Sequence, residues 1–177
     1  DWNAGAQRLT TDNAEPNSRL EQTSFALSAG TRIDPRTDAR AVVRYDGATT
    51  GTPGPTAFGR PDLDASFERE DVVASLSVRR VDTRLTQQAN VGYAHTDQLS
   101  LNPEDSGCYV PEWEGQTGAY PFCDFPDPAG FQNRTARLAA GYQADLSVGT
   151  NHLLTGGAEV EHETGEIGNR SGELLAP

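Results

Sequence analysis

This sequence lacks the features by which many membrane and nucleic-acid-binding proteins are recognised. No apolar run approaches the ~20 residues of a membrane helix, which excludes a helical membrane protein. Lysine is absent, and the fourteen basic residues, all of them Arg, are outnumbered by 26 acidic residues, so that the net charge is −12. Binding to phosphates needs concentrated Arg and Lys, and this charge balance therefore argues against a nucleic-acid partner.

Catalytic and zinc-binding motifs are also missing. The sequence offers no nucleophile beside a base and no glycine-rich loop that would cradle a phosphate, so an enzyme is not expected. Its two cysteines, Cys108 and Cys123, have no second Cys or His pair at zinc spacing. Because both lie in one polar stretch, we expect a disulfide typical of an oxidising compartment, which would contribute ~3 kcal/mol by restraining the unfolded chain.

What the sequence does have is alternation of apolar and polar residues with a period of two. In one segment, for example, Leu138, Ala140 and Tyr142 alternate with positions that include Arg137 and Gln143. Successive side chains of a strand point to opposite faces, so this period predicts a two-faced sheet. We expect about six strands, at residues 22–33, 38–47, 71–81, 86–97, 134–146 and 152–163, and we interpret residues 1–20 as the tail of an earlier loop.

The connections between these segments alternate in length. Tight polar turns are predicted at 34–37, 82–84 and 148–151, whereas long stretches run from 48 to 70 and from 99 to 133. Short turns on one rim and long loops on the other are typical of outer-membrane barrels and rare in sandwiches. The predicted fold is all-β: an antiparallel up-and-down meander forming part of a larger transmembrane β-barrel with long extracellular loops.

The order of these elements resembles a known family. A polar loop entry at 11–19 is followed by a strand, a tight turn and a strand, and then by Gly-Thr-Pro-Gly-Pro at 51–55, as in the TonB-dependent outer-membrane receptors. Residues 51–69 look most like the vitamin B12 receptor branch, and His-Leu-Leu-Thr-Gly-Gly-Ala-Glu at 152–159 is similar to a mid-barrel strand of these receptors. The resemblance spans nearly the whole chain.

The resemblance implies active import across the outer membrane of a Gram-negative bacterium. Such receptors are 22-stranded barrels filled by a plug domain; they bind a scarce metal chelate, a siderophore or cobalamin, and draw energy from TonB through the plug. On this comparison residues 1–177 are a partial barrel domain, without the plug, the TonB-contacting box or the closing aromatic strand, and import belongs to the parent protein. Two alternatives stay open: a porin-like or structural barrel, and a secreted β-sandwich that binds glycans.

The longest connection, 99–133, holds the candidate ligand site. Aromatic faces offer large, rigid contact areas to a bulky ligand, and we therefore assign ligand binding to Tyr109, Trp113, Tyr120 and Phe122. The alternative is that these rings pack around the disulfide and hold the loop shut. Trp113 and Tyr120, which are flanked by Glu and Gly, are the two expected to be exposed, and they would form the platform of a glycan-binding protein.

Carboxylates and histidines supply the remaining candidates. Asp62, Asp64 and Glu68 offer the oxygen ligands of a calcium site, although a solvated acidic stretch would read the same way. The alternating positions that hold the tyrosines and histidines, the first phase, are expected to face outer-membrane lipid. The other positions, the second phase, are expected to form a hydrated wall of the lumen, in which Arg137 neighbours three Glu residues. These residues are Tyr45, Tyr93, Tyr142, His95, His152 and His162 on the first phase, and Glu159, Glu161 and Glu163 on the second.

Overall fold

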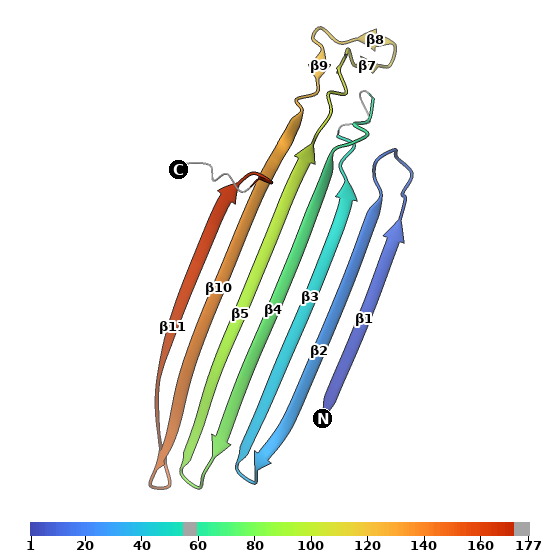
Figure 1. Ribbon diagram of the computed structural model, residues 1–177. Helices are drawn as coiled ribbons and strands as arrows, with labels where there is room; N and C mark the ends of the chain where they lie inside the picture. The colour runs from blue at the N-terminus through green and yellow to red at the C-terminus, as the bar shows by residue number, and fades with distance from the viewer. Residues whose placement is uncertain (55–59, 172–177) are drawn as a thin grey trace.

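The computed structural model describes residues 1–54 and 60–171, and its main element is one sheet of seven antiparallel strands in chain order (Figure 1). This arrangement confirms the predicted all-β meander. The strands are β1 (Trp2–Thr11), β2 (Leu20–Asp34), β3 (Thr37–Gly51), β4 (Ser66–Val81), β5 (Leu85–Asn102), β10 (Asp127–Val148) and β11 (His152–Gly168).

Short turns and long loops lie at opposite ends of the strands, as Figure 1 shows. The tight turns after β2, β4 and β10 lie at the end that we call the turn edge, and they confirm the predicted turn positions. In the first turn the Asp34 carboxylate accepts a hydrogen bond from the Arg36 N–H at 2.8 Å, and Pro35 presets the backbone angle. The other end, the loop edge, carries the connections 12–19, 52–65 and 103–126.

The strands are more numerous and longer than the sequence predicted. Residues 2–11 form β1, paired along its whole length with β2, so the interpretation of this segment as a loop was wrong. Its alternation is weak because Gly5 and the small Ala4 and Ala6 blur the apolar phase. Both long connections are shorter than expected, because β3 and β5 continue several residues beyond their predicted ends and β4 and β10 begin several residues before their predicted starts.

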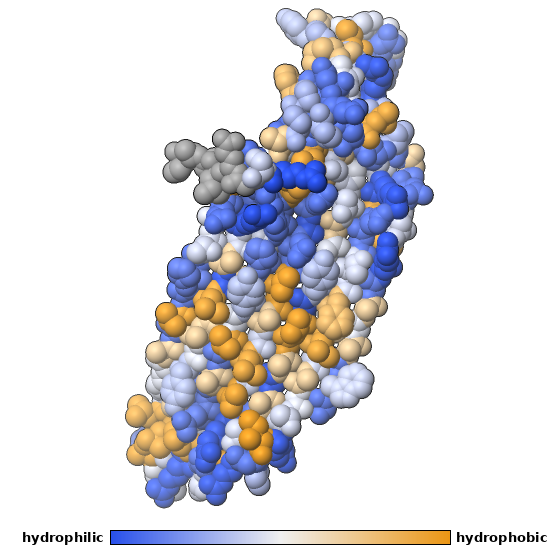
Figure 2. Space-filling model, in the orientation of Figure 1, coloured by the Kyte–Doolittle hydropathy of each residue, from blue (hydrophilic) through white to orange (hydrophobic). Residues whose placement is uncertain are grey.

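The pairing register gathers the two sequence phases onto the two faces of the sheet. Leu27, Val43, Ala74, Tyr93 and Leu138 follow one another across neighbouring strands on one side, the apolar face. Figure 2 shows apolar side chains gathered over the middle and lower parts of the strands, with polar ones nearer the loop edge. The opposite side, the polar face, carries the alternate positions.

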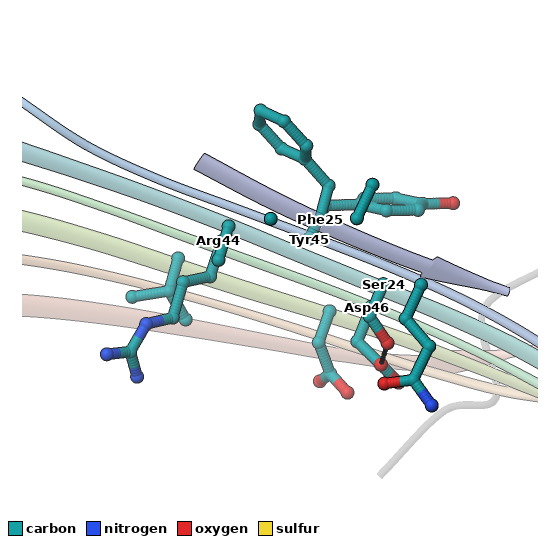
Figure 3. Close-up of a pocket in the computed structure, with 11 residues that line it drawn as sticks. Ser24, Phe25, Arg44, Tyr45 and Asp46 are labelled. Atoms are coloured by element: carbon teal, nitrogen blue, oxygen red, sulfur yellow. Dashed lines mark hydrogen bonds between the residues drawn. The ribbon is translucent and has the colours of Figure 1, made fainter. Parts of the chain in front are cut away.

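A close view separates the two faces residue by residue. Phe25 and Tyr45 project from one side of the sheet, whereas Ser24, Arg44 and Asp46 project from the other (Figure 3). The expected phase assignment of the tyrosines and histidines agrees with this register, because Tyr93 lies opposite Leu138, which in turn lies opposite His162.

Almost nothing is buried in the described part of the chain. Ala65, at 8% exposure, is its one buried apolar side chain, whereas Leu138 is 50% exposed and Val160 is 68% exposed. The chain exposes 12445 Å², about half as much again as the ~8,400 Å² expected of a compact monomer of its mass. The sheet is therefore a single layer whose apolar face is not covered by any other part of the described chain. No helix in the described residues has the length and apolarity to cross a membrane.

Candidate functional site

The three loops of the loop edge are tied to one another. The Asn17 side-chain amide donates a hydrogen bond to the Ala65 carbonyl at 2.7 Å, which joins the first loop to the second. The Asp64 carboxylate accepts one from the Glu104 N–H at 2.7 Å, and this joins the second loop to the third. Arg60 adds a second link, because its guanidinium donates to the Ser106 carbonyl at 3.3 Å. The loop edge is thus a connected structure.

A hollow of about 250 Å³ lies between the second and third loops. Its lining combines an aromatic side, a guanidinium and a carboxylate: Tyr109 and Phe122, Arg60, and Asp124. Such a mixture can contact a bulky ligand by ring stacking and orient it by charge. Arg60 and Asp124 were not among the residues assigned from the sequence, because only the contact between the two loops brings them to the same hollow.

The predicted disulfide is present and organises this hollow. Cys108 and Cys123 are bonded, and they face each other in the two-stranded sheet of β6 (Cys108–Tyr109) and β9 (Phe122–Cys123). The next pair in the same register is Tyr109 and Phe122, whose rings stack with their centroids 6.0 Å apart and 17° between their planes. These two candidate ligand contacts therefore pack beside the disulfide, as the alternative reading of the loop proposed.

Trp113 and Tyr120 lie farther out. The hairpin of β7 (Glu112–Trp113) and β8 (Gln116–Thr117) turns through Glu114 and Gly115, which both have positive φ, at 50° and 78°, as a two-residue hairpin turn of type I′ requires. Trp113 is 57% exposed and Tyr120 is 80% exposed, which agrees with the expectation that this pair faces solvent. The four aromatic candidates thus divide into an inner stacked pair and an outer exposed pair.

Asp124 holds the base of the third loop. Its carboxylate accepts hydrogen bonds from the Ser106 N–H at 2.9 Å, the Asn102 side-chain amide at 2.6 Å and the Phe125 N–H at 2.8 Å. These donors, the Ser106 N–H foremost, favour the charged carboxylate and lower the pKa of Asp124 below its usual value. One ionised side chain therefore fixes both ends of the disulfide loop.

The proposed calcium ligands serve other roles in the described structure. The Asp62 carboxylate accepts hydrogen bonds from the N–H groups of Asp64 and Ala65, at 3.0 and 2.9 Å, and so closes a turn. Asp64 bonds to the third loop, and Glu68 lies on β4. Among the described residues, no group of three or more His, Cys, Asp or Glu side chains is placed to hold a metal ion. The calcium site stays a prediction without a supporting geometry.

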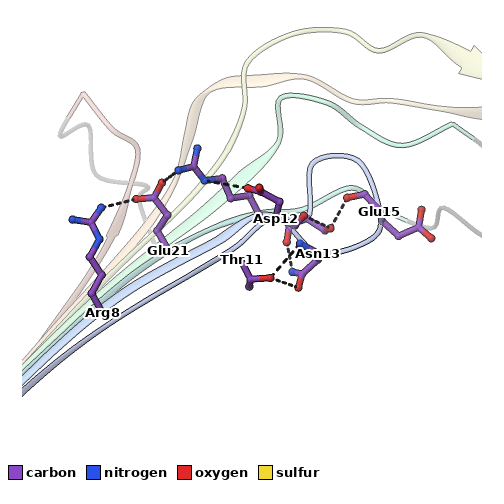
Figure 4. A network of polar contacts seen from close by, with 8 residues as sticks. Arg8, Thr11, Asp12, Asn13, Glu15 and Glu21 are labelled. Carbon is purple, nitrogen blue, oxygen red and sulfur yellow. Dashed lines mark hydrogen bonds and ion pairs between the residues drawn. The ribbon is translucent and has the colours of Figure 1, made fainter.

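A polar network at the first loop was not anticipated from the sequence. Glu21, at the start of β2, forms ion pairs with Arg8 and Arg19, and Arg19 in turn lies 3.8 Å from the Asp12 carboxylate (Figure 4). Nearby, the Asn13 N–H donates to the Thr11 hydroxyl at 3.3 Å. The network ties β1, β2 and their loop together just beyond the apolar face.

The polar face contains paired charges and hydrogen-bonded carboxylates. Gln22 and Ser24 both donate to the Asp46 carboxylate. Arg137 pairs with Glu161, which agrees with the expectation that this Arg neighbours the acidic positions of the last strand. The described part of this face can therefore hold polar solutes and water next to fixed charges.

Comparisons with protein-family models, with curated proteins and with solved structures found no match to this chain. The functional argument therefore depends on the geometry of the sheet and its loops.

Proposed function

We propose that this chain is a segment of a transmembrane β-barrel in the outer membrane of a Gram-negative bacterium, and that its loop edge captures a ligand outside the cell. The observation that carries the proposal is the single-layer sheet with one apolar and one polar face. A water-soluble sheet buries its apolar face against a second layer. A barrel wall instead turns that face to lipid and the polar face to a lumen.

The height of the apolar face supports this assignment. On β10 its band extends from Ala136, in the row of Tyr45, to Leu146, in the row of Leu85, which is ten residues; across β4 and β5 the row of Ala144 is polar, since it holds Arg80 and Gln87. At ~3.3 Å per residue this length is ~33 Å, and a strand tilt of ~40° reduces it to the ~25 Å of a barrel's lipid-facing band. The row after the upper limit is charged, with Glu70, Asp97 and Arg134 in register, as expected where strands leave the hydrocarbon.

Ligand capture is proposed from the loop edge. A disulfide, a stacked aromatic pair and three hydrogen-bonded links between loops give a preorganised surface, which lowers the entropy lost on binding. Its exposed Trp113 and Tyr120 add two rigid aromatic contacts. Together with the family resemblance, these features favour a TonB-dependent receptor whose ligand is a metal chelate, a siderophore or cobalamin. Import and coupling to TonB would belong to the whole receptor, through its plug.

The membrane assignment is tested by the behaviour of the purified chain with and without detergent. In plain buffer the exposed apolar face should drive aggregation, whereas in micelles the chain should show the circular dichroism of a sheet. A sharp, cooperative thermal transition of a monomer in detergent-free buffer would contradict the proposal and favour the secreted β-sandwich.

Ligand capture is tested separately, by fluorescence in micelles. The variant Trp2→Phe leaves Trp113 as the single tryptophan, and Trp113 belongs to the loop edge. Titration with ferric siderophores and with cobalamin should quench its emission at a saturating concentration. A linear, non-saturating response to every chelate would remove the receptor assignment and leave a porin-like or structural barrel.

A further inference from the structure

The outer edge of β11 is a long, open pairing surface. Among the strands that the structure describes, β11 pairs only with β10, and its residues from His152 to Ile167 are all exposed. An edge strand presents a row of backbone donors and acceptors to a further strand. On the membrane proposal these groups cannot be left open in lipid, because unpaired backbone groups there cost several kcal/mol each.

The polar face of β11 carries an uncompensated charge. Glu159, Glu161 and Glu163 stand on it at every second residue, and a single guanidinium on β10, that of Arg137, pairs directly with Glu161. The β10 residues opposite Glu159 and Glu161 are Gly141 and Ala139, which offer no side-chain donor, whereas Glu163 lies opposite Arg137, whose guanidinium pairs with Glu161 instead. Within the described residues, Glu159 and Glu163 form no direct hydrogen bond or ion pair, although both feel the charge of Arg137.

Carboxylates on the inner strands of the same face are compensated. Asp71 pairs with Arg69 at 2.6 Å, and Asp46 accepts hydrogen bonds from Gln22 at 2.9 and 3.2 Å. Asp71 is paired with Arg69 of its own strand and accepts a hydrogen bond from the Thr96 hydroxyl on β5, whereas the donors to Asp46 lie on β2. The surplus of negative charge on β11 lies beside an edge that no described strand pairs.

A second copy of this chain does not fit the open edge. β1 and β11 both run from the turn edge to the loop edge, so β11 of one copy would meet β1 of a similarly oriented copy in parallel (Figure 1). Pairing β11 with β11 of an inverted copy around Glu161 would place Glu opposite Glu, and directly opposed like charges are destabilising. Because the two edge strands, β1 and β11, run in the same direction, an odd number of further strands is needed to close an antiparallel barrel.

We infer that the open edge of β11 pairs with an antiparallel strand that carries Arg or Lys on the polar face, opposite Glu159, Glu161 and Glu163, and apolar residues on the other face. This inference rests on the proposed barrel, in which the strand belongs to the same wall. The β1 edge has different chemistry, because its polar-face residues Asn3, Gly5 and Gln7 are neutral. The two edges are thus distinguishable by charge.

The test uses the full chain in detergent micelles and synthetic strands of about 11 residues, the length of a membrane strand. One peptide alternates Val and Thr and carries Arg at the three positions opposite the Glu residues, and a second peptide has Gln at those positions. We expect the Arg peptide to bind roughly 3- to 100-fold more tightly, because three opposite-charge cross-strand pairs act together. Hydrogen exchange should show new protection in β11 and none in β1.

A pair of variants separates the edge charge from the overall charge. The triple variant Glu159→Gln/Glu161→Gln/Glu163→Gln should remove the preference for the Arg peptide. The matched control Glu104→Gln/Glu112→Gln/Glu114→Gln makes the same change of net charge at the loop edge and should keep the preference.

Equal binding of the two peptides, a preference that survives the triple Glu→Gln change on β11, or protection at β1 would each overturn the inference while leaving the barrel proposal intact. The barrel proposal fails by a different result, namely the cooperative folding of a monomer in plain buffer. The two failures are therefore distinguishable.

Discussion

Introducing a single arginine near the middle of the apolar face tests whether that face contacts lipid or water. Val91 lies on the inner strand β5, in register with Leu76 and Ala140 on the flanking strands, and it is 40% exposed. Ala140 is four residues from the upper limit of the ten-residue apolar band at Ala136, which places the row of Val91 close to the middle of the band.

The variant Val91→Arg is expected to lower the free energy of unfolding by very different amounts in lipid and in water. At the middle of a bilayer, an Arg on the lipid-facing side of a barrel costs ~2–4 kcal/mol, which corresponds to a roughly 30- to 700-fold loss in the folding equilibrium. On a half-exposed surface in water, the same change would stay within about 0.5 kcal/mol. The matched control is Asn90→Arg, because Asn90 is the neighbouring residue and faces the polar side, opposite Ser77 and Gly141.

The measurement is the urea dependence of unfolding for the chain reconstituted in phosphatidylcholine vesicles, followed by circular dichroism. We expect the midpoint of Val91→Arg to fall well below that of the unaltered chain, and the midpoint of Asn90→Arg to stay close to it. Equal midpoints for the two variants would refute the reasoning, because they would mean that both faces contact water. A larger loss for Asn90→Arg would refute it as well, since the lipid would then be on the other face.

Three further predictions concern the loop edge. Replacing both cysteines, Cys108→Ser/Cys123→Ser, removes a restraint of ~3 kcal/mol on the unfolded loop; proteolysis within 103–126 should accelerate, while hydrogen exchange in the main strands stays unchanged. Because the pKa of Asp124 is lowered in the folded chain, its stabilising contribution is present above the usual value of 3.8 and is lost as pH falls through the folded pKa. Proteolysis within 103–126 should therefore accelerate in acid. The variant Asp124→Asn should remove most of that pH dependence. Tyr120→Ala should weaken the binding of a chelate that quenches Trp113 by about 2 kcal/mol if the ring is a central contact, and an unchanged affinity would assign binding to the inner stacked pair.

Much of the sheet could be predicted from local pattern. Apolar and polar side chains alternate along a strand with a period of two residues, and a turn such as 34–37 depends on the local chemistry of Asp34 and Pro35. Strand β1 could not be found in this way, because its small residues carry little alternation and its strand conformation depends on pairing with β2. Strand ends were also misplaced, because ladder hydrogen bonds carry β3 and β5 past the point where the alternation fades.

The candidate site was only partly predictable. The disulfide followed from two cysteines in one polar stretch, and the exposure of Trp113 followed from its polar neighbours. Arg60 and Asp124 could not be assigned, because their roles depend on a loop contact between residues more than forty positions apart. The calcium site stays a prediction, and the structure adds that Asp62 uses its carboxylate to close a turn.

The sequence by itself determined which side chains share a face and where the chain reverses, because both depend on neighbours one to four residues away. Only the tertiary structure decided the register that aligns the strands into one apolar band, the contacts that join the loops, and the edge of β11 that no described strand pairs. These features depend on contacts between distant segments, and the energy of such a contact is set by the pairing partner as much as by the residue itself.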